Sequence, residues 1–506
     1  MKIMSEIREI REKKRELFKE RQGVYNVGRF EKTHHCAQAK ELPDDTEGVA
    51  LAGRIVAMRD MGKLCFGQVK DSHGKCQFGL DVGTLGKEEY KFLTKNLDIG
   101  DFVGFQGKMF TTKKGEKTLR AAEVILLSKS LNPLPEKWKG LADSETCARQ
   151  RYLDLIANKE TWDRFGKRNR ILRLIRNFLD KHEFVEVETP ILQAVSSGAS
   201  ARPFITHHNA LDIPLYLRIA PETYLKRLIV GGYDKVFELG KNFRNEGVDS
   251  SHLQEFTMLE FYATYWNYRD NMKFIHEMIV HIVQEVCGSL EVEYQGAKID
   301  FSGEWKEVTY RDLLLEDTGI DLHKIEGLKH LKEEVQSKGI KMDLSSFVGT
   351  GALIDALYKR VSRPKLIQPM FLTKHPTELV PLARCSDENS KELDMFQVVV
   401  NSWEIVKAYS ELVDPIEQRQ RLMEQQALAD AGDEEAMMFE DDFVQSMEYG
   451  MPPMSGLGLG VDRLVALLTD SKSIRDVVFF PSVRPPSADS QNVEEGKKEV
   501  TETTSN

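Results

Sequence analysis

The stretch KNFRNEGVDSSHLQEFTMLEFYATY, from Lys241 to Tyr265, decides the fold. Two strand-like segments flank a long loop (245–254) that contains serine and glycine, so we predict a β-hairpin. Side chains alternate between the two faces of a strand. One face of the second strand then carries Phe256, Met258, Glu260 and Tyr262, and the other carries Thr257, Leu259 and Phe261.

The face with Glu260 and Tyr262 should border a pocket, because a buried charge is costly unless it is paired or liganded. We expect Arg244 and Glu246 to share a face of the first strand. Arginine binds phosphate in a bidentate manner, and flat rings stack on bases. The hairpin therefore suits a nucleotide with a cationic small molecule, and a solvent-facing hairpin with cross-strand ion pairs remains the alternative.

A second stretch, SGLGLGVDRLVALL from Ser455 to Leu468, favours the pocket. Its glycines 456, 458 and 460 fall on one face of a strand, and such bare backbone often marks close approach by a ligand or another chain segment. Asp462 and Arg463 then open an amphipathic helix. The pattern is not a phosphate-binding Walker loop.

These motifs carry a resemblance to a known family. FRNEG with HLQEFTMLE is similar to motif 2 of the class II aminoacyl-tRNA synthetases, GLGLGVDR to motif 3, and FVEVETPIL (184–192) to motif 1. Residues 197–232 closely resemble the lysyl-tRNA synthetases. The resemblance covers about residues 48–486, with the motifs in order. The chain is therefore identified as a member of the bacterial type of class II lysyl-tRNA synthetase.

Composition agrees with a globular chain of two or more domains. The 506 residues are 41% hydrophobic and carry a net charge of −10, so any tRNA contact must use local basic patches. The six cysteines form no CxxC pair, and we expect thiols rather than metal ligands at HHC (34–36) and at Cys65 and Cys76. No apolar run approaches 18 residues, which predicts a soluble, cytoplasmic protein with no membrane contact.

We divide the chain into five segments and predict an α+β fold class. Residues 1–47 form a helical extension and linker, whose helix (1–22) should end at Gly23 and present Ile3, Ile7, Ile10 and Leu17 on one face. Its positive charge leaves two roles open, a solvated helix or a tRNA-backbone contact. The other segments are a five-stranded barrel of the oligonucleotide-binding (OB) type (48–130), a linker (131–160), the catalytic domain (161–486) and a disordered tail (487–506).

The catalytic domain should be an antiparallel sheet flanked by helices, as in class II synthetases. In the strand–turn–strand stretch 396–414, Lys407, Tyr409 and Glu411 share a face, and Glu404 is out of phase with them. All four reach one pocket only if a β-bulge intervenes. The resemblance also implies a homodimer through the helix at 161–182 and motif 1.

The resemblance implies ATP-dependent ligation of L-lysine to tRNA(Lys) through lysyl-adenylate, with Mg²⁺. ATP would be bound by Arg244, Glu246, His252, Phe256 and Arg463, of which Arg244 is catalytic. Lysine would be bound by Gly198, Glu222, Glu260, Tyr262, Tyr409 and Glu411. Metal ligands would be Glu404, Gln397 and Glu411. The anticodon would be bound by Arg59, Phe66 and Gln77, although Phe66 could instead be a core residue.

Three departures from the family pattern stand out. Gln397 occupies the position of an acidic Mg²⁺ ligand, Lys407 that of an asparagine, and Ser251-His252-Leu253-Gln254 that of Arg-His-Asn-Pro. We hypothesise that Lys407 neutralises phosphate charge directly and reduces the need for Mg²⁺. Alternatives that remain open are an aspartyl- or asparaginyl-tRNA synthetase, a ligase that adds lysine to a protein, and a non-catalytic RNA-binding paralogue.

Overall fold

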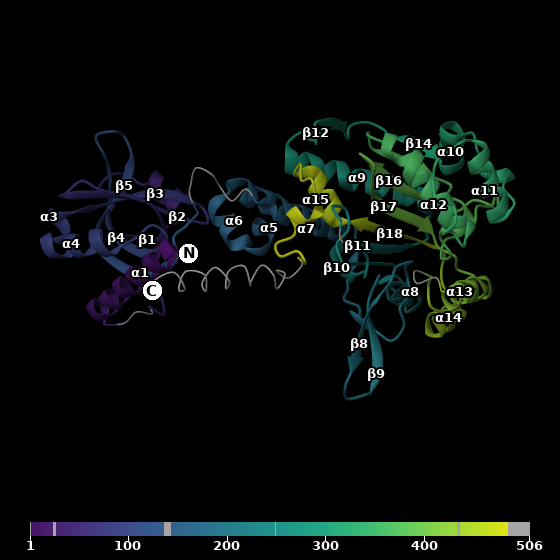
Figure 1. The fold of residues 1–506 in the computed structure, drawn as a ribbon, viewed down its shortest axis with the longest axis horizontal. Helices are drawn as coiled ribbons and strands as arrows, with labels where there is room; N and C mark the ends of the chain where they lie inside the picture. The colour runs from purple at the N-terminus through teal and green to yellow at the C-terminus, as the bar shows by residue number, and fades with distance from the viewer. Residues whose placement is uncertain (1, 24–26, 136–142, 248, 433–435, 484–506) are drawn as a thin grey trace, which may run out of the picture. The chain divides into compact units, whose positions relative to one another are not determined.

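The computed structural model describes residues 2–23, 27–135, 143–247, 249–432 and 436–483 (Figure 1). The chain forms two compact units, Met1–Ala142 with Tyr152–Asn158, and Asp143–Arg151 with Lys159–Asn506. The predicted tail and part of the predicted linker (136–142) lie outside the described residues.

The first unit contains a closed five-stranded barrel, which confirms the predicted OB-type barrel. Its strands, in the order β1-β2-β3-β5-β4, are β1 (Val49–Asp60), β2 (Leu64–Asp71), β3 (Gly74–Asp81), β4 (Phe102–Thr111) and β5 (Lys117–Ser128). Alternate residues of β2 point inward, so Cys65 and Val69 are buried. Two helices that the sequence analysis missed, α3 (Val82–Leu85) and α4 (Lys87–Asn96), connect β3 to β4.

Helix α1 (Lys2–Gln22) ends before Gly23, whose φ of +73° suits glycine, as predicted. Ile10 and Leu17, which the sequence places on one apolar face, are exposed, so this face is not the one that is buried. Among residues 5–22 of α1 the buried ones are Arg11 and Phe18, and the Phe18 ring lies 4.9 Å from that of Phe92. A second short helix, α2 (Cys36–Glu41), precedes the barrel.

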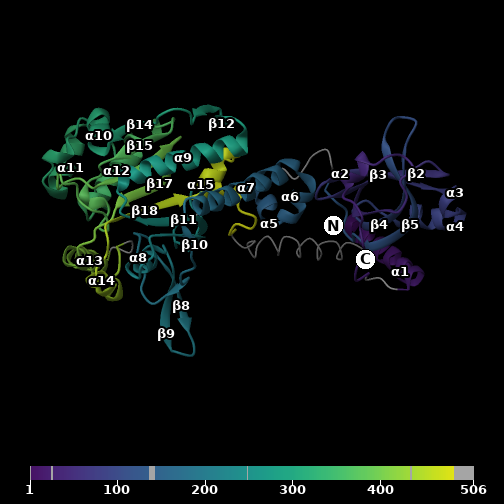
Figure 2. The same ribbon diagram turned by 180° about the vertical axis from the view of Figure 1, so that it is seen from behind.

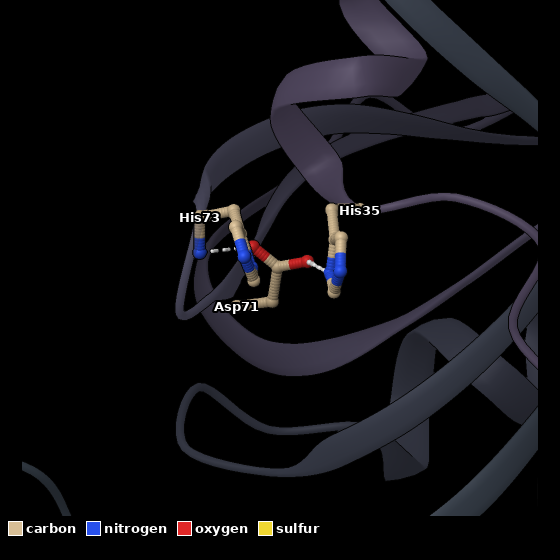
Figure 3. A group of neighbouring side chains, drawn as sticks. All are labelled: His35, Asp71 and His73. Carbon is tan, nitrogen blue, oxygen red and sulfur yellow. Dashed lines mark hydrogen bonds and ion pairs between the residues drawn. The ribbon is translucent and has the colours of Figure 1, made fainter.

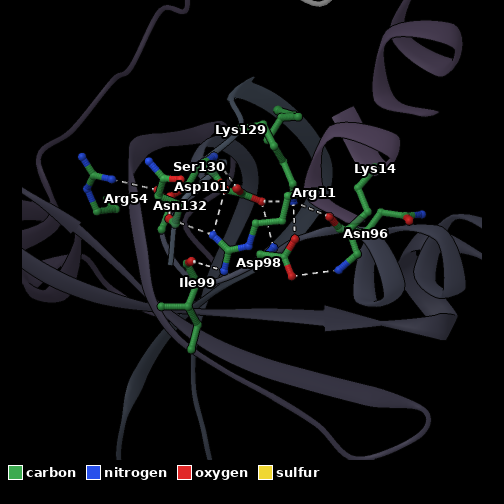
Figure 4. Close-up of polar contacts among 12 residues, drawn as sticks. Arg11, Lys14, Arg54, Asn96, Asp98, Ile99, Asp101, Lys129, Ser130 and Asn132 are labelled. Carbon is green, nitrogen blue, oxygen red and sulfur yellow. Dashed lines mark hydrogen bonds and ion pairs between the residues drawn. The ribbon is translucent and has the colours of Figure 1, made fainter. Parts of the chain in front are cut away.

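A polar network holds α1 against the barrel (Figure 4). Arg11 donates hydrogen bonds to the carbonyl oxygens of Ser130, Asn132 and Ile99. Lys129, fully buried, lies 2.6 Å from an Asp98 oxygen and 2.7 Å from an Asp101 oxygen. Because buried polar groups must be paired, this network rather than an apolar stripe fixes the position of α1.

The second unit is built on an eight-stranded sheet in the order β14-β15-β16-β17-β18-β11-β10-β6 (Figure 1). The strands are β6 (Val185–Glu186), β10 (Lys235–Phe243), β11 (Glu255–Thr264), β14 (Lys306–Thr309), β15 (Met370–Thr373), β16 (Met395–Val400), β17 (Trp403–Ser410) and β18 (Met454–Gly460). The central strands are antiparallel, as predicted, whereas the edge pairs β14/β15 and β6/β10 are parallel.

Three helices cover one face of this sheet (Figure 2). They are α7 (Lys159–Lys181), α9 (Tyr268–Cys287) and α15 (Val461–Leu468). Their apolar residues pack against the inward residues of the strands, such as Leu259, Phe261, Val406 and Leu457. The opposite face of the sheet is left for the polar residues of the same strands.

The remaining elements form smaller groups. Helices α10 (Tyr310–Thr318), α11 (Gly327–Ser337) and α12 (Thr350–Val361) form an apolar cluster with β14 and β15. Helices α8 (Glu222–Val230), α13 (Pro415–Asp430) and α14 (Asp441–Glu448) pack near β10 and β11. The others are α5 (Ser144–Arg149), α6 (Arg151–Ala157), β7 (Leu192–Gln193), β8 (Phe204–His208), β9 (Ile213–Leu217), β12 (Glu291–Tyr294) and β13 (Ala297–Asp300). No helix within the described ranges has the length and apolar character to cross a membrane.

The buried ion pairs of Lys129 should stabilise the barrel measurably. Lys129→Met leaves the Asp101 carboxylate buried without its ammonium, and we expect a loss of about 3–5 kcal/mol. Hydrogen exchange of peptides from β1–β5 in the full chain would measure this as lost protection. Arg8→Met, which breaks the exposed Arg8–Glu12 pair, should change protection little. Equal effects of the two substitutions would contradict the role of Lys129.

Candidate active site

The hairpin predicted around Lys241–Tyr265 is present as β10 and β11, which pair antiparallel from Lys235↔Ala263 to Phe243↔Glu255. One part of the prediction was wrong. Arg244 and Glu246 do not lie on the first strand, because β10 ends at Phe243 and both residues belong to the loop. The Arg244 N–H still donates to the Gln254 carbonyl at 2.9 Å, so Arg244 stays close to the end of the sheet.

The polar face of the sheet has the alternation that the sequence predicts. Leu259 and Phe261 of β11 pack into the core below the sheet, whereas Glu260 and Tyr262 face the other side. On β18, a side chain at Gly456 would overlap the Tyr262 ring and the Glu411 carboxylate. The bare backbone of this strand therefore lets neighbouring side chains approach the sheet.

A buried ion cluster lies beside this face. The Lys226 ammonium lies 2.6 Å from Glu222 Oε1 and 2.5 Å from Glu411 Oε2, and the Tyr409 hydroxyl donates to Glu222 Oε1 at 2.7 Å. Lys226 and the backbone N–H of Gly456 both stabilise the charged form of Glu411. Gly198, with φ of +87°, places its Cα beside Glu222, since a Cβ there would lie 3.2 Å from the Glu222 Cβ.

Glu260 is buried on β11 directly opposite Glu238 of β10. Arg218 neutralises Glu238 through a 2.5 Å ion pair. Burial, together with the nearby charge of Glu222, raises the pKa of Glu260 to about 8, although Arg244 and Arg218 oppose this. A cationic ligand group that reached Glu260 would therefore stabilise its charged form.

The residues expected to bind a nucleotide gather at the other end of this face. The Arg244 guanidinium lies 5.1 Å from the centre of the Phe256 ring, and its buried Nε has no partner. Arg463 donates to the Glu404 carbonyl at 2.8 Å. Burial lowers the pKa of Arg244, while the carboxylates of Glu246 and Glu260 oppose that effect.

A buried contact joins the two motifs. Asp462 at the start of α15 accepts from Arg168 at 2.5 Å and from the Thr257 N–H at 2.8 Å. This contact fixes helix α15 against strand β11. In the loop, Asp249 accepts from His252 Nδ1 at 2.7 Å and from the backbone of Ser251, and these bonds outweigh burial and lower the pKa of Asp249 to about 2. Asp249 thus orients the His252 ring.

The predicted bulge is present. Val398 pairs with Val406 and Val399 with Glu404, so the register between β16 and β17 shifts by one residue. Glu404 therefore shares a face with Lys407, as the prediction requires.

Beside the bulge, Gln397 Nε2 donates to Glu404 Oε2 at 2.7 Å. Lys407 lies opposite Gln397 and makes no ion pair with any described residue. Behind them, burial lowers the pKa of His375 to about 3; a hydrogen bond with Gln397 opposes this effect and the charge of Lys407 adds to it.

These residues limit how a metal could be held. Glu404 and the Gln397 amide oxygen supply one carboxylate and one neutral oxygen, which fits one Mg²⁺ that keeps several waters. Glu411 is engaged with Lys226.

In the barrel unit, the ligand atoms of His35, Asp71 and His73 lie within 4.8 Å of one another (Figure 3). However, the two rings stack at 3.6 Å, and His35 Nδ1 lies 3.0 Å from the Lys32 ammonium. Asp71 already accepts backbone N–H groups, including that of Cys36. This group therefore ties α2 to the β2–β3 turn, and Cys65 and Cys76 are free, buried thiols as expected.

The expected anticodon residues share the outer face of the barrel. Arg59 of β1 pairs with Phe66 of β2, and Phe66 pairs with Gly79 of β3, two residues after Gln77. Phe66 is half-exposed and outside the barrel core, in contrast to its buried neighbour Cys65. The Gln77 amide donates to Thr118 at 2.8 Å. The three side chains thus form one accessible surface.

The sequence analysis missed several residues of the site. They are Arg168, Arg218, Lys226 and Glu238. Lys226 follows Glu222 by four residues, a spacing that places both on one side of a helix, so a signal existed. Nothing in the sequence indicated that this side would be buried.

A closed OB-type barrel followed by an antiparallel sheet with these three motifs is the architecture of a class II tRNA synthetase. Residues 143–484 match the family described as tRNA synthetases class II (D, K and N). Residues 49–127 match the OB-fold nucleic acid binding domain.

Curated relatives narrow the assignment. The chain is 47% identical to a lysine–tRNA ligase of Aquifex aeolicus over 86% of this chain and 73% of the relative. It is 45% identical to one of Pelotomaculum thermopropionicum over 90% and 91%, and 42% identical to one of Thermosipho melanesiensis over 98% and 100%. The chain therefore belongs to the lysine–tRNA ligase family of class II synthetases.

The contact of Gly456 with the ion cluster predicts that alanine is tolerated less well at Gly456 than at Gly458 of the same strand. Gly456→Ala forces the Tyr262 ring and the Glu411 carboxylate to move, at a cost of about 1–3 kcal/mol. Gly458→Ala is the matched control on the same face, because its Cβ meets only the flexible end of Met258 at 2.5 Å. Thermal unfolding should show a loss for Gly456→Ala and little change for Gly458→Ala. The reverse order would contradict this packing.

Proposed function

We propose that this chain joins L-lysine to tRNA(Lys) in two steps. The lysine carboxylate attacks the α-phosphorus of ATP, which gives lysyl-adenylate and releases pyrophosphate. A terminal ribose hydroxyl of the tRNA then attacks the lysyl carbonyl and releases AMP. Membership of the lysine–tRNA ligase family supports this proposal.

The buried carboxylates of Glu222 and Glu411 are the observation that carries the choice of lysine. An aspartate or asparagine substrate would need a basic or neutral pocket, whereas this one is acidic. We infer that the two carboxylates bind the side-chain ammonium, with the Tyr409 and Tyr262 hydroxyls beside it and Gly198 leaving room. Glu260 would bind the α-amino group. An analogue without the ammonium would leave buried carboxylates unpaired.

On the nucleotide side, Arg244 would bind the α-phosphate and the substrate carboxylate, because its buried Nε has no partner. Phe256 and Arg463 would stack on adenine and Glu246 would accept from the adenine amine. His252, oriented by Asp249, would contact the outer phosphates. Positioning and charge neutralisation, rather than covalent catalysis, would carry the rate.

We infer that Glu404 and Gln397 would hold Mg²⁺, which when bound would neutralise phosphate charge. Glu411 is left out of this set, because Lys226 and the proposed substrate use its carboxylate. Lys407 would bind phosphate directly, since its ammonium has no carboxylate partner among the described residues.

The rest of the assignment concerns the whole chain. The barrel (48–130) would bind the anticodon through Phe66 stacking and hydrogen bonds from Arg59 and Gln77. The other proposed segments are the linker (131–160) and the catalytic domain (161–486). A homodimer through α7 and motif 1, and a cytoplasmic location, belong to the same proposal.

ATP–pyrophosphate exchange with each amino acid in turn would test the function. We expect exchange with lysine alone. Exchange with aspartate or asparagine would mean that the pocket is misassigned. Absence of exchange in folded protein that binds tRNA would favour the non-catalytic paralogue.

The role of Lys407 predicts a change in metal dependence. Lys407→Asn removes the phosphate-binding ammonium, so half-maximal exchange should need several-fold more Mg²⁺, by Coulomb interaction with the triphosphate. Lys407→Arg keeps the charge and is the control. Unchanged Mg²⁺ dependence in Lys407→Asn would contradict direct neutralisation by Lys407.

A further inference from the structure

Lys226 is the one component of the ion cluster with no assigned role. It is fully buried, and its ammonium is paired with Glu222 and Glu411. The rings of Tyr262, Tyr409 and Phe443 have their centres 5.8, 5.7 and 5.7 Å from it. The chain thus places a lysine of its own at the carboxylates proposed to bind a lysine ligand.

The contacts leave one oxygen of each carboxylate available to a ligand. Lys226 uses Oε1 of Glu222, which also accepts from Tyr409, and Oε2 of Glu411. Glu222 Oε2 makes no hydrogen bond to a described residue. Glu411 Oε1 is buried and lies against the bare backbone of Gly456, whose N–H stabilises the carboxylate.

The charges of this cluster do not cancel. Two carboxylates and one ammonium leave one negative charge in a buried place, and such a charge requires a proton or a ligand cation. The titratable groups that face Glu411 are Lys226 and Glu222 of α8, Tyr409 of β17 and Tyr262 of β11. Burial and Glu222 raise the pKa of Glu411 to about 8 against the effect of Lys226. The two carboxylates outweigh burial at Lys226 and raise the pKa of its ammonium.

We propose that Lys226 determines specificity as an internal counter-ion, which neutralises one carboxylate so that the pocket retains a single negative charge for one ligand ammonium. This inference rests on the proposed binding of lysine by Glu222 and Glu411. It assigns Lys226 to positioning and charge balance, not to contact with the reacting atoms.

The charge count makes a prediction for two variants. Glu411→Gln removes one carboxylate, so the charges of Glu222 and Lys226 cancel and none remains for the ligand ammonium; lysine affinity should fall at least about tenfold. Adding Lys226→Met, which keeps the side-chain length without the charge, leaves Glu222 as a single uncompensated carboxylate. The double variant should therefore bind lysine at least about tenfold more tightly than Glu411→Gln.

Equilibrium binding of L-lysine to the full-length protein at pH 7.5 would test this, with ATP binding as a check on folding. Glu260, whose pKa is also raised, is common to all variants, so the difference between them isolates Lys226. Glu411→Gln combined with Lys226→Arg keeps the charge and should bind lysine as weakly as Glu411→Gln alone. If the double variant with methionine at 226 binds lysine no better than Glu411→Gln, the counter-ion role is wrong.

Two further outcomes complete the test. If the intact chain binds ATP but no lysine, the proposed substrate site fails and the role of Lys226 fails with it. If the double variant does not fold, calorimetry of the intact chain in buffers of different ionisation enthalpy replaces it. Proton release on lysine binding at pH 7 would then support the proposal, and proton uptake or no release would overturn it.

Discussion

The burial of carboxylates on one face of the β-sheet is the constraint on which the site depends. Glu222, Glu260 and Glu411 are all nearly inaccessible to solvent, and an uncompensated charge in such a place destabilises the fold. The structure compensates with Lys226 at two of them and with arginines near the third. The negative charge that remains on these carboxylates matches the positive charge of a small cationic ligand.

Because side chains alternate along each strand, the residues that pack in the core and the residues that form the site lie on opposite faces of the sheet. On β11, β17 and β18 one set of residues packs against α9 and α15, while the intervening set forms the site. Glycine at alternate positions of β18 leaves the site face of this strand without side chains. The bulge in β17 places Glu404 on the same face of the sheet. Because Asp462 bonds to both Arg168 and the Thr257 backbone, helix α15 cannot shift without moving β11.

Local patterns predicted much of this architecture, because hairpins, glycine alternation and bulges are visible within one or two strands. The barrel, the pairing of β10 with β11 and the shared face of Glu404 and Lys407 were all predictable in this way. Features that depend on partners distant in the sequence were not. The α1 helix buries Arg11 instead of Ile10, because carbonyl oxygens near residues 99–132 accept its hydrogen bonds. Likewise, an i, i+4 pair such as Glu222 and Lys226 is typical of an exposed helix, and here the packing of α8 against β10, β11 and α14 buries it.

Equilibrium binding of L-lysine and norleucine to the intact chain and to Glu411→Gln would test the central claim most directly. Norleucine has the length of lysine without the ammonium, so it reports on the carboxylates alone. We predict that the intact chain prefers lysine by at least about a hundredfold, and that Glu411→Gln loses most of this preference while it retains ATP binding. Equal binding of the two amino acids by the intact chain, or an unchanged preference in Glu411→Gln, would contradict the assignment of this buried acidic pocket to the substrate ammonium.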